Sequence, residues 1–277
     1  MGGFNFFYDW YSASIDERLD NFWSVCKSEF AGGGFGIGKP MLGYTSCDKF
    51  MLANGEHVFS VYYGGNSQGN RLFVVGTGSN AVLTADFLKR RYPGHHLVRA
   101  DVAVDFNESG AWDSMYRFMI ALADKYGLQK SYIGEPGKEV GECERGRTLY
   151  IGSRRSEFFW RLYEKGKKDN PDEPDWVRLE FECKPSNKNK LLRIALAGVT
   201  ASHLFSYVDV GQDIKNALGC EILPLSPVLN APRSRTDFDR ALLHVKKQYN
   251  ATFTELMKRC EGDCMRFASE LMGFSTK

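Results

Sequence analysis

The chain has 277 residues and a formal net charge of +2, with 43% hydrophobic and 25% charged residues. These values are typical of a globular protein with one large or two small domains, and any nucleic-acid surface must be a local patch because the total charge is so small. No stretch approaches eighteen apolar residues, which excludes a membrane-spanning helix. The first ten residues resemble no secretory signal, so we expect a cytoplasmic protein with reduced cysteines.

The predicted elements are strands and helices in mixed order. In chain order they are a helix over 15–30, three strands within 41–75, a helix over 79–91, a strand over 96–106, a helix over 109–126, two or three strands up to 183, a helix over 188–204 and a helical segment over 236–272. This order predicts an α+β fold, a central antiparallel sheet flanked by helices. A proline-rich linker predicts an α+β domain over 1–222 and a helical C-terminal segment over 223–277, and no internal repeat is visible.

A glycine-rich run, GGFGIGK at 33–39, matches the first part of a phosphate-binding P-loop. The full motif needs Ser or Thr after the lysine to hold magnesium, and a strand before it. Here Pro40 follows, and the preceding segment is predicted to be helical. We therefore interpret the run as a flexible glycine loop, and ATP hydrolysis is not supported.

Two aspartates share one face of the strand predicted over 96–106. Asp101 and Asp105 lie opposite the apolar residues of this strand. Aspartate is disfavoured in strand interiors, so the pair indicates a solvated face, a salt bridge to arginine or a metal site. Residues four apart on a strand are about 13 Å apart, so both cannot easily bind one ion. We favour Asp105 as a metal ligand, with Asp101 second.

Residues 148–184 are the most informative segment, because they predict two strands with functional side chains on fixed faces. Arg161, Tyr163 and Lys165 alternate along the later part of this segment, so they point the same way. A tyrosine between two cations is a candidate nucleophile, since adjacent cations would favour the phenolate. Tyr150, on the preceding strand, is the competing nucleophile, and a place in an aromatic cluster is the simpler interpretation of Tyr163.

The last strand of this segment carries alternating charges. Arg178, Glu180, Glu182 and Lys184 share one face. The two glutamates are about 7 Å apart in a regular strand, so one can bind a metal while the other pairs with a cation. Taken alone, the pattern fits a charged outer sheet face better than a metal site.

Basic residues cluster in and around the same segment. They are Arg145, Arg147, Arg154, Arg155, Lys167, Lys168, Lys188, Lys190 and Arg193. Interleaved with aromatic residues, this pattern suits a phosphate backbone with unstacked bases. A solvated charged surface is the alternative.

Several motifs in order resemble the replication initiation factor family, the rolling-circle initiators of certain small plasmids and filamentous bacteriophages. They are YYGGN at 62–66, RADVAVDF at 99–106, TLYIGSRRS at 148–156, RLYEKG at 161–166 and WVRLE at 176–180. The resemblance covers residues 43–204 and implies a fold related to HUH endonucleases. The chain lacks the His-x-His pair of those enzymes, which agrees with the carboxylate-rich metal site that the resemblance implies.

The resemblance implies a site-specific single-strand DNA endonuclease and strand transferase. A tyrosine would attack one strand at the replicon origin, leave a 5′-phosphotyrosine link and a free 3′-OH, and later rejoin the ends. Carried over by motif, Tyr163 is the nucleophile, and Lys165 and Arg161 lie near the scissile phosphate. Asp105 and Glu180 are the ligands of Mg²⁺ or Mn²⁺, with Asp101 as a third candidate.

The implied partners are origin DNA, as a hairpin or a single strand, and the host helicase and polymerase. The implied location is the cytoplasm of a bacterial host; no membrane partner is expected, and a homodimer stays open. Two other functions fit the same residues: a non-catalytic protein that binds hairpin or single-stranded nucleic acid, and a phage structural or regulatory protein with a charged sheet.

Overall fold

The computed structural model describes residues 3–66, 71–134, 146–170, 172–221 and 237–272. The chain divides into two compact units, Met1–Asn230 and Ala231–Lys277. The described residues of the second unit form α8 (Asp237–Arg259) and α9 (Cys264–Met272), which pack through the rings of Phe253 and Phe267. In the part of the chain that the structure describes, no helix has the length and apolarity that a membrane span requires.

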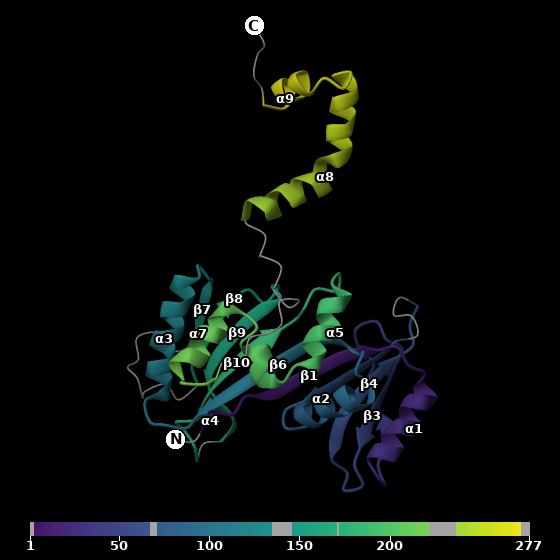
Figure 1. Ribbon diagram of the computed structural model, residues 1–277, viewed down its shortest axis with the longest axis vertical. Coiled ribbons are helices and arrows are strands. Elements are labelled where there is room, and N and C mark those ends of the chain that lie inside the picture. Colours follow the sequence, from purple (N-terminus) through teal and green to yellow (C-terminus); the bar gives the residue numbers. More distant parts are fainter. Residues whose placement is uncertain (1–2, 67–70, 135–145, 171, 222–236, 273–277) are drawn as a thin grey trace. The chain divides into compact units, whose positions relative to one another are not determined.

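The first unit is built on one ten-stranded sheet in which every neighbouring pair is antiparallel (Figure 1). Its strands are β1 (Phe7–Ile15), β2 (Gly34–Ile37), β3 (Ser46–Met51), β4 (His57–Tyr63), β5 (Leu72–Thr77), β6 (His96–Phe106), β7 (Lys130–Ile133), β8 (Thr148–Gly152), β9 (Phe158–Glu164) and β10 (Val177–Cys183). Across the sheet the order is β2-β3-β4-β5-β1-β6-β10-β9-β8-β7. The predicted α+β fold with a central antiparallel sheet is confirmed.

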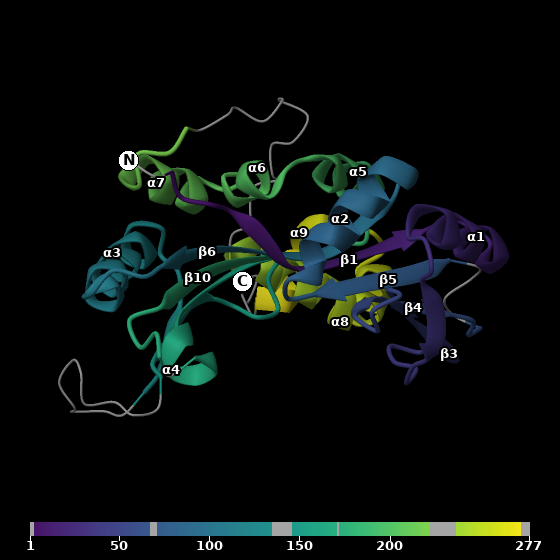
Figure 2. The ribbon, with the colours of Figure 1, turned by 90° about the horizontal axis from the view of Figure 1, so that it is seen from below.

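Helices cover one face of this sheet. They are α1 (Leu19–Glu29), α2 (Asn80–Arg91), α3 (Ala111–Lys125), α5 (Lys190–Gly198), α6 (Ala201–Phe205) and α7 (Asp209–Ala217). The short α4 (Lys165–Asp169) lies on the other side, beside Tyr163. Figure 2 shows α2, α5, α6 and α7 together on the same side. This helix face is apolar: Phe181 of β10 and Trp160 of β9 pack against Phe205 of α6. We call the opposite face, which carries the predicted functional side chains, the site face.

The two halves of the sheet repeat one topology. The order β1-α1-β2-β3-β4-β5-α2 recurs as β6-α3-β7-β8-β9-β10-α5, with the short α4 added between β9 and β10. Read outward from the centre, the N-terminal half-sheet is β1-β5-β4-β3-β2 and the C-terminal half-sheet is β6-β10-β9-β8-β7. The sequence shows no repeat, because strand pairing depends on backbone hydrogen bonds and only loosely on side-chain identity. The junction of the half-sheets is the pairing of β1 with β6.

Three elements differ from the sequence predictions. β1 was not predicted, and its alternation is broken by a register shift between Tyr8 and Trp10 that leaves Asp9 as an extra residue. The glycine run is not a flexible loop, since β2 pairs with β3 along the sheet edge. The helix predicted over 188–204 is two helices, because Thr200 is extended and its hydroxyl accepts the His203 backbone N–H at the start of α6.

A buried histidine at the turn between α2 and β6 makes stability depend on pH. His95 is 2% exposed, and its Nε2 lies 2.6 Å from the Tyr11 hydroxyl. Burial lowers its pKa to about 4, against a hydrogen bond with the Tyr92 carbonyl that raises it. The unfolded chain therefore takes up this proton at a higher pH than the folded one, and stability falls as the pH drops from 6.5 towards 4.

We expect the free energy of unfolding to fall by about 3 kcal/mol between pH 6.5 and pH 4 because of this histidine. Urea unfolding of the wild type and of His95→Gln at a series of pH values measures it. The variant should lose less stability between pH 6.5 and pH 4 than the wild type does. Parallel curves for the two proteins would contradict the assignment.

Candidate active site

The register of the sheet gathers the predicted residues on the site face. Tyr163 of β9 lies opposite Arg178 of β10, and Arg161 lies opposite Glu180. On the other side of β10, Arg178 lies opposite Asp105 of β6. Directly opposed residues in an antiparallel pair point to the same face, so these side chains form one surface across three strands.

Tyr163 is directed at a carboxylate. Its hydroxyl donates to Glu180 Oε1 at 2.5 Å, while Arg161 Nε donates to the other oxygen, Oε2, at 2.9 Å. Burial raises the pKa of Tyr163 well above its ordinary value, and the negative charge of Glu180 raises it further, although Arg178 opposes the shift. The expectation that neighbouring cations favour the phenolate is therefore wrong, because the nearest charge is negative. The pair is instead a neutral phenol with its proton held by a carboxylate.

A second acidic residue lies beside this pair. Asp101 is 3% exposed and lies opposite Glu182 of β10. Arg99 joins the two carboxylates, at 2.5 Å from Asp101 Oδ2 and 2.8 Å from Glu182 Oε2. Burial raises the pKa of Asp101 to about 6, with Glu182 and Glu180 adding to the shift and Arg99 opposing it. Burial is therefore the main reason that Asp101 keeps its proton to a higher pH than a free aspartate does.

Asp105 is placed apart from the other predicted metal ligands. Its carboxylate receives Arg178 Nε at 2.6 Å and Nη2 at 2.7 Å. Arg178 also donates to Asp9, the extra residue of β1, at 2.7 Å. By contrast, Glu180 and Asp101 share Arg161, whose Nη2 contacts Glu180 Oε2 and lies 3.7 Å from Asp101 Oδ2. The structure therefore brings together two of the three predicted ligands.

The fit of a metal ion rests on these two carboxylates. Within the described ranges, no group of three or more His, Cys, Asp or Glu side chains is arranged to hold an ion. Glu180 and Asp101 are nonetheless buried oxygen donors that share one cation, the guanidinium of Arg161. Oxygen donors are what Mg²⁺ and Mn²⁺ prefer. In donor type the pair fits a divalent cation, although the guanidinium groups of Arg161 and Arg99 already pair with the two carboxylates.

Two further predicted residues lie at the edge of the cluster. Lys165 does not continue the strand, because β9 ends at Glu164 and Lys165 begins α4. Its ammonium pairs with Asp169 at 2.6 Å and still lies 5.9 Å from the centre of the Tyr163 ring. The competing nucleophile, Tyr150, stacks on Phe159 at 5.7 Å.

A buried ion pair fixes the strand end next to Tyr163. Glu164 accepts Arg147 Nη2 at 2.7 Å and Nε at 2.9 Å, and the guanidinium lies 4.8 Å from the Trp112 ring centre of α3. Burial alone would raise the pKa of Glu164, but hydrogen bonds from Arg147 and Lys167 lower it below its ordinary value. Sequence reasoning missed this pair. The available signal was a glutamate on the otherwise apolar face of β9.

β1 contributes residues that were also missed, because the strand itself was not predicted. Asp9 holds Arg178, and the Trp10 ring lies 4.8 Å from the Arg99 guanidinium. The run of aromatic residues from Phe6 to Tyr11 has high β-propensity and was the signal for this strand.

Comparisons with known proteins show what the chain resembles. Residues 95–215 match the model of the replication initiation factor family, and these residues include Tyr163, Glu180 and Asp101. Among solved structures, the chain is similar to the rolling circle replication initiator protein from Geobacillus stearothermophilus. The TM-score is 0.53 at 19% identity, over 87% of this chain and 96% of that one. No curated protein sequence matches the chain significantly.

The structural likeness shows the fold, and the family match covers the strands that carry the charged cluster, from β6 to β10. The resemblance read from the motifs is confirmed by the match of residues 95–215 to the replication initiation factor family.

Proposed function

We propose that the chain is a rolling-circle replication initiator that nicks and rejoins one DNA strand at the origin through a tyrosine. The observation that carries this proposal is the 2.5 Å hydrogen bond from the Tyr163 hydroxyl to Glu180, within the region that matches the family. A general base must lie within hydrogen-bonding reach of the proton that it removes, and this carboxylate does.

In the proposed reaction, the Tyr163 oxygen attacks the phosphorus of the scissile phosphodiester while Glu180 takes the phenolic proton. A bond forms between the tyrosine oxygen and phosphorus, and the bond from phosphorus to the 3′ oxygen breaks. The leaving 3′ oxygen takes up a proton, and the 5′ phosphate stays on the tyrosine. Attack by a 3′-OH reverses these steps and rejoins the strand without ATP, because the phosphodiester energy is conserved in the covalent link.

The cations of the cluster suit this chemistry. Arg161 borders Glu180 and Asp101, and Lys165 borders the Tyr163 ring, so both lie where a phosphate at Tyr163 would gain negative charge in the transition state. Asp101 and Oε2 of Glu180, the oxygen that does not face Tyr163, would hold Mg²⁺ or Mn²⁺, which would polarise the phosphate and stabilise the leaving oxygen. Asp105, held by Arg178, is the more distant candidate ligand.

As an initiator, the protein would act on origin DNA in the cytoplasm of a bacterial host. The free 3′-OH would serve the host polymerase, and a host helicase would open the duplex. Basic and aromatic side chains around the cluster support DNA binding: Arg154 covers the rings of Tyr150 and Phe159 at 5.0 and 5.6 Å.

A denaturing gel tests this function directly. Single-stranded and supercoiled DNA of the replicon that encodes the chain is labelled and incubated with the protein in Mg²⁺ or Mn²⁺. We expect a covalent adduct in which the protein is joined to the 5′ end of the downstream fragment, and no adduct in EDTA. DNA binding without cleavage in any divalent cation would overturn the proposal in favour of a non-catalytic binding protein.

A further inference from the structure

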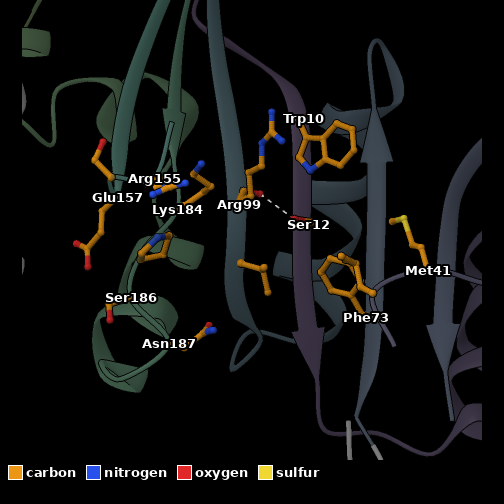
Figure 3. A pocket seen from close by; sticks show the side chains of 14 residues that line it. Trp10, Ser12, Met41, Phe73, Arg99, Arg155, Glu157, Lys184, Ser186 and Asn187 are labelled. Atoms are coloured by element: carbon orange, nitrogen blue, oxygen red, sulfur yellow. Dashed lines mark hydrogen bonds between the residues drawn. The ribbon is translucent and has the colours of Figure 1, made fainter. Parts of the chain in front are cut away.

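The site face has a pocket that the proposed reaction does not use. It is a cavity of about 670 Å³ at the junction of the two half-sheets, lined by β1, β5, β6 and the loops on either side (Figure 3). Cavities of about 300–1,000 Å³ are typical of sites for small molecules and single ligand groups. The pocket is therefore large enough for one flat ring system.

One side of the pocket is apolar and aromatic. Trp10 of β1, Phe73 of β5 and Val98 of β6 line it, and Met41 borders it. Phe73 is 6% exposed and is held by a parallel stack with Tyr44, at 5.9 Å between ring centres. Fixed aromatic rings are the usual platforms on which unpaired bases stack, whatever the base.

The same pocket offers hydrogen-bonding groups. The indole Nε1 of Trp10 is a buried donor, and the described residues supply no acceptor for it. A buried donor without an acceptor is costly, so this N–H is suited to a ligand. Ser12, Ser186 and Asn187 also line the cavity. Nucleobases present acceptors and donors along their edges, which these groups can match.

Cations lie on the other side of the pocket. Figure 3 shows Arg155 and Lys184 on the side of Arg99, while the Glu157 carboxylate points away from them. Arg155 is exposed, which leaves its guanidinium accessible to a phosphate. Aromatic rings, a donor without an acceptor and nearby cations together describe a nucleotide within a strand better than an apolar ligand.

The pocket is joined to the proposed nicking centre through Arg99. This guanidinium lines the cavity and also pairs with Asp101 and Glu182. Lys184 directly follows β10 and lies six residues beyond Arg178, which is opposite Tyr163. Six residues of extended chain span about 20 Å. A DNA strand that follows the site face from Tyr163 therefore reaches the pocket within about six stacked nucleotides.

We propose that this pocket binds one unpaired nucleobase of the strand that Tyr163 cleaves, within about six nucleotides of the scissile bond. The assignment rests on the proposed function for the identity of the strand. The base would stack on the Trp10 ring, and the flanking phosphate would lie near Arg155.

Binding without cleavage tests the pocket separately from the nicking reaction. The affinity of the full chain for a dye-labelled oligothymidylate, and for an abasic oligonucleotide of the same length, is measured by fluorescence anisotropy in EDTA. We expect Trp10→Ala to bind oligothymidylate roughly five- to hundredfold more weakly than the wild type and to bind the abasic strand equally well. Trp23→Ala, in α1 and outside the pocket, is the matched control.

A second variant avoids any question of folding. Arg155→Ala changes an exposed side chain, and we expect it to weaken the binding of both oligonucleotides. The slope of the logarithm of the binding constant against the logarithm of salt concentration should become shallower by about one. Arg117→Ala, exposed on α3, is its control. The proposal is overturned if Trp10→Ala binds oligothymidylate like the wild type, or loses affinity equally for the abasic strand. Absence of a covalent adduct, with the Trp10 effect intact, would refute the proposed function and leave the base pocket standing.

Discussion

Replacing Tyr163 with phenylalanine is expected to abolish the covalent DNA adduct and to lower strand cleavage by roughly a thousandfold or more. The substitution removes only the attacking oxygen. The ring keeps its place between β8 and β10, and Glu180 keeps the hydrogen bond from Arg161 Nε. DNA binding should therefore be preserved, which anisotropy measures on the same preparation. The adduct itself is followed on the denaturing gel described above.

Tyr150→Phe is the matched control for this result. Tyr150 lies on the same face of the neighbouring strand, opposite Arg161, but its ring is stacked on Phe159. We expect this variant to form the adduct at close to the wild-type rate. If Tyr150→Phe loses the adduct and Tyr163→Phe keeps it, the nucleophile is Tyr150 and the proposed function still stands.

Breaking the Arg147–Glu164 pair is expected to destabilise the protein by about 3–5 kcal/mol. The two side chains are 8% and 4% exposed, so removing one leaves a buried charge with a weaker partner: Lys167 at 3.1 Å for Glu164, or Asp113 at 3.8 Å for Arg147. Arg147→Leu and Glu164→Leu should each show this loss in urea unfolding. The double variant should recover much of it, because neither charge is then buried alone.

The same three variants also test whether the Arg147–Glu164 pair positions Tyr163. Glu164 follows Tyr163 directly, and its backbone N–H donates to the Arg147 carbonyl at 3.1 Å. A double variant as stable as the wild type that forms the adduct more slowly would indicate that the pair positions Tyr163. Single variants that unfold like the wild type would contradict the assignment of a buried ion pair.

Much of the site could be predicted because its residues lie on strands with regular alternation. Tyr163, Arg161 and Glu180 were expected to share a face of the sheet, and the register of β9 with β10 brings them into contact. The partners of each charge could not be predicted, since register is a property of pairs of strands that are far apart in sequence. That is why Asp105 was favoured as a metal ligand, although β10 sets Arg178 opposite it.

The sequence by itself determined the α+β class, the strand faces and the resemblance to the family, because alternation and ordered motifs are local properties of the chain. Tertiary structure alone decided the state of Tyr163: burial and the nearby Glu180 carboxylate hold it as a neutral phenol, where the flanking cations had suggested a phenolate. It also decided the place of β1, whose bulge hides its alternation but whose pairing with β6 joins two half-sheets and forms the pocket around Trp10. Both outcomes depend on contacts between strands distant in sequence, which no local pattern encodes.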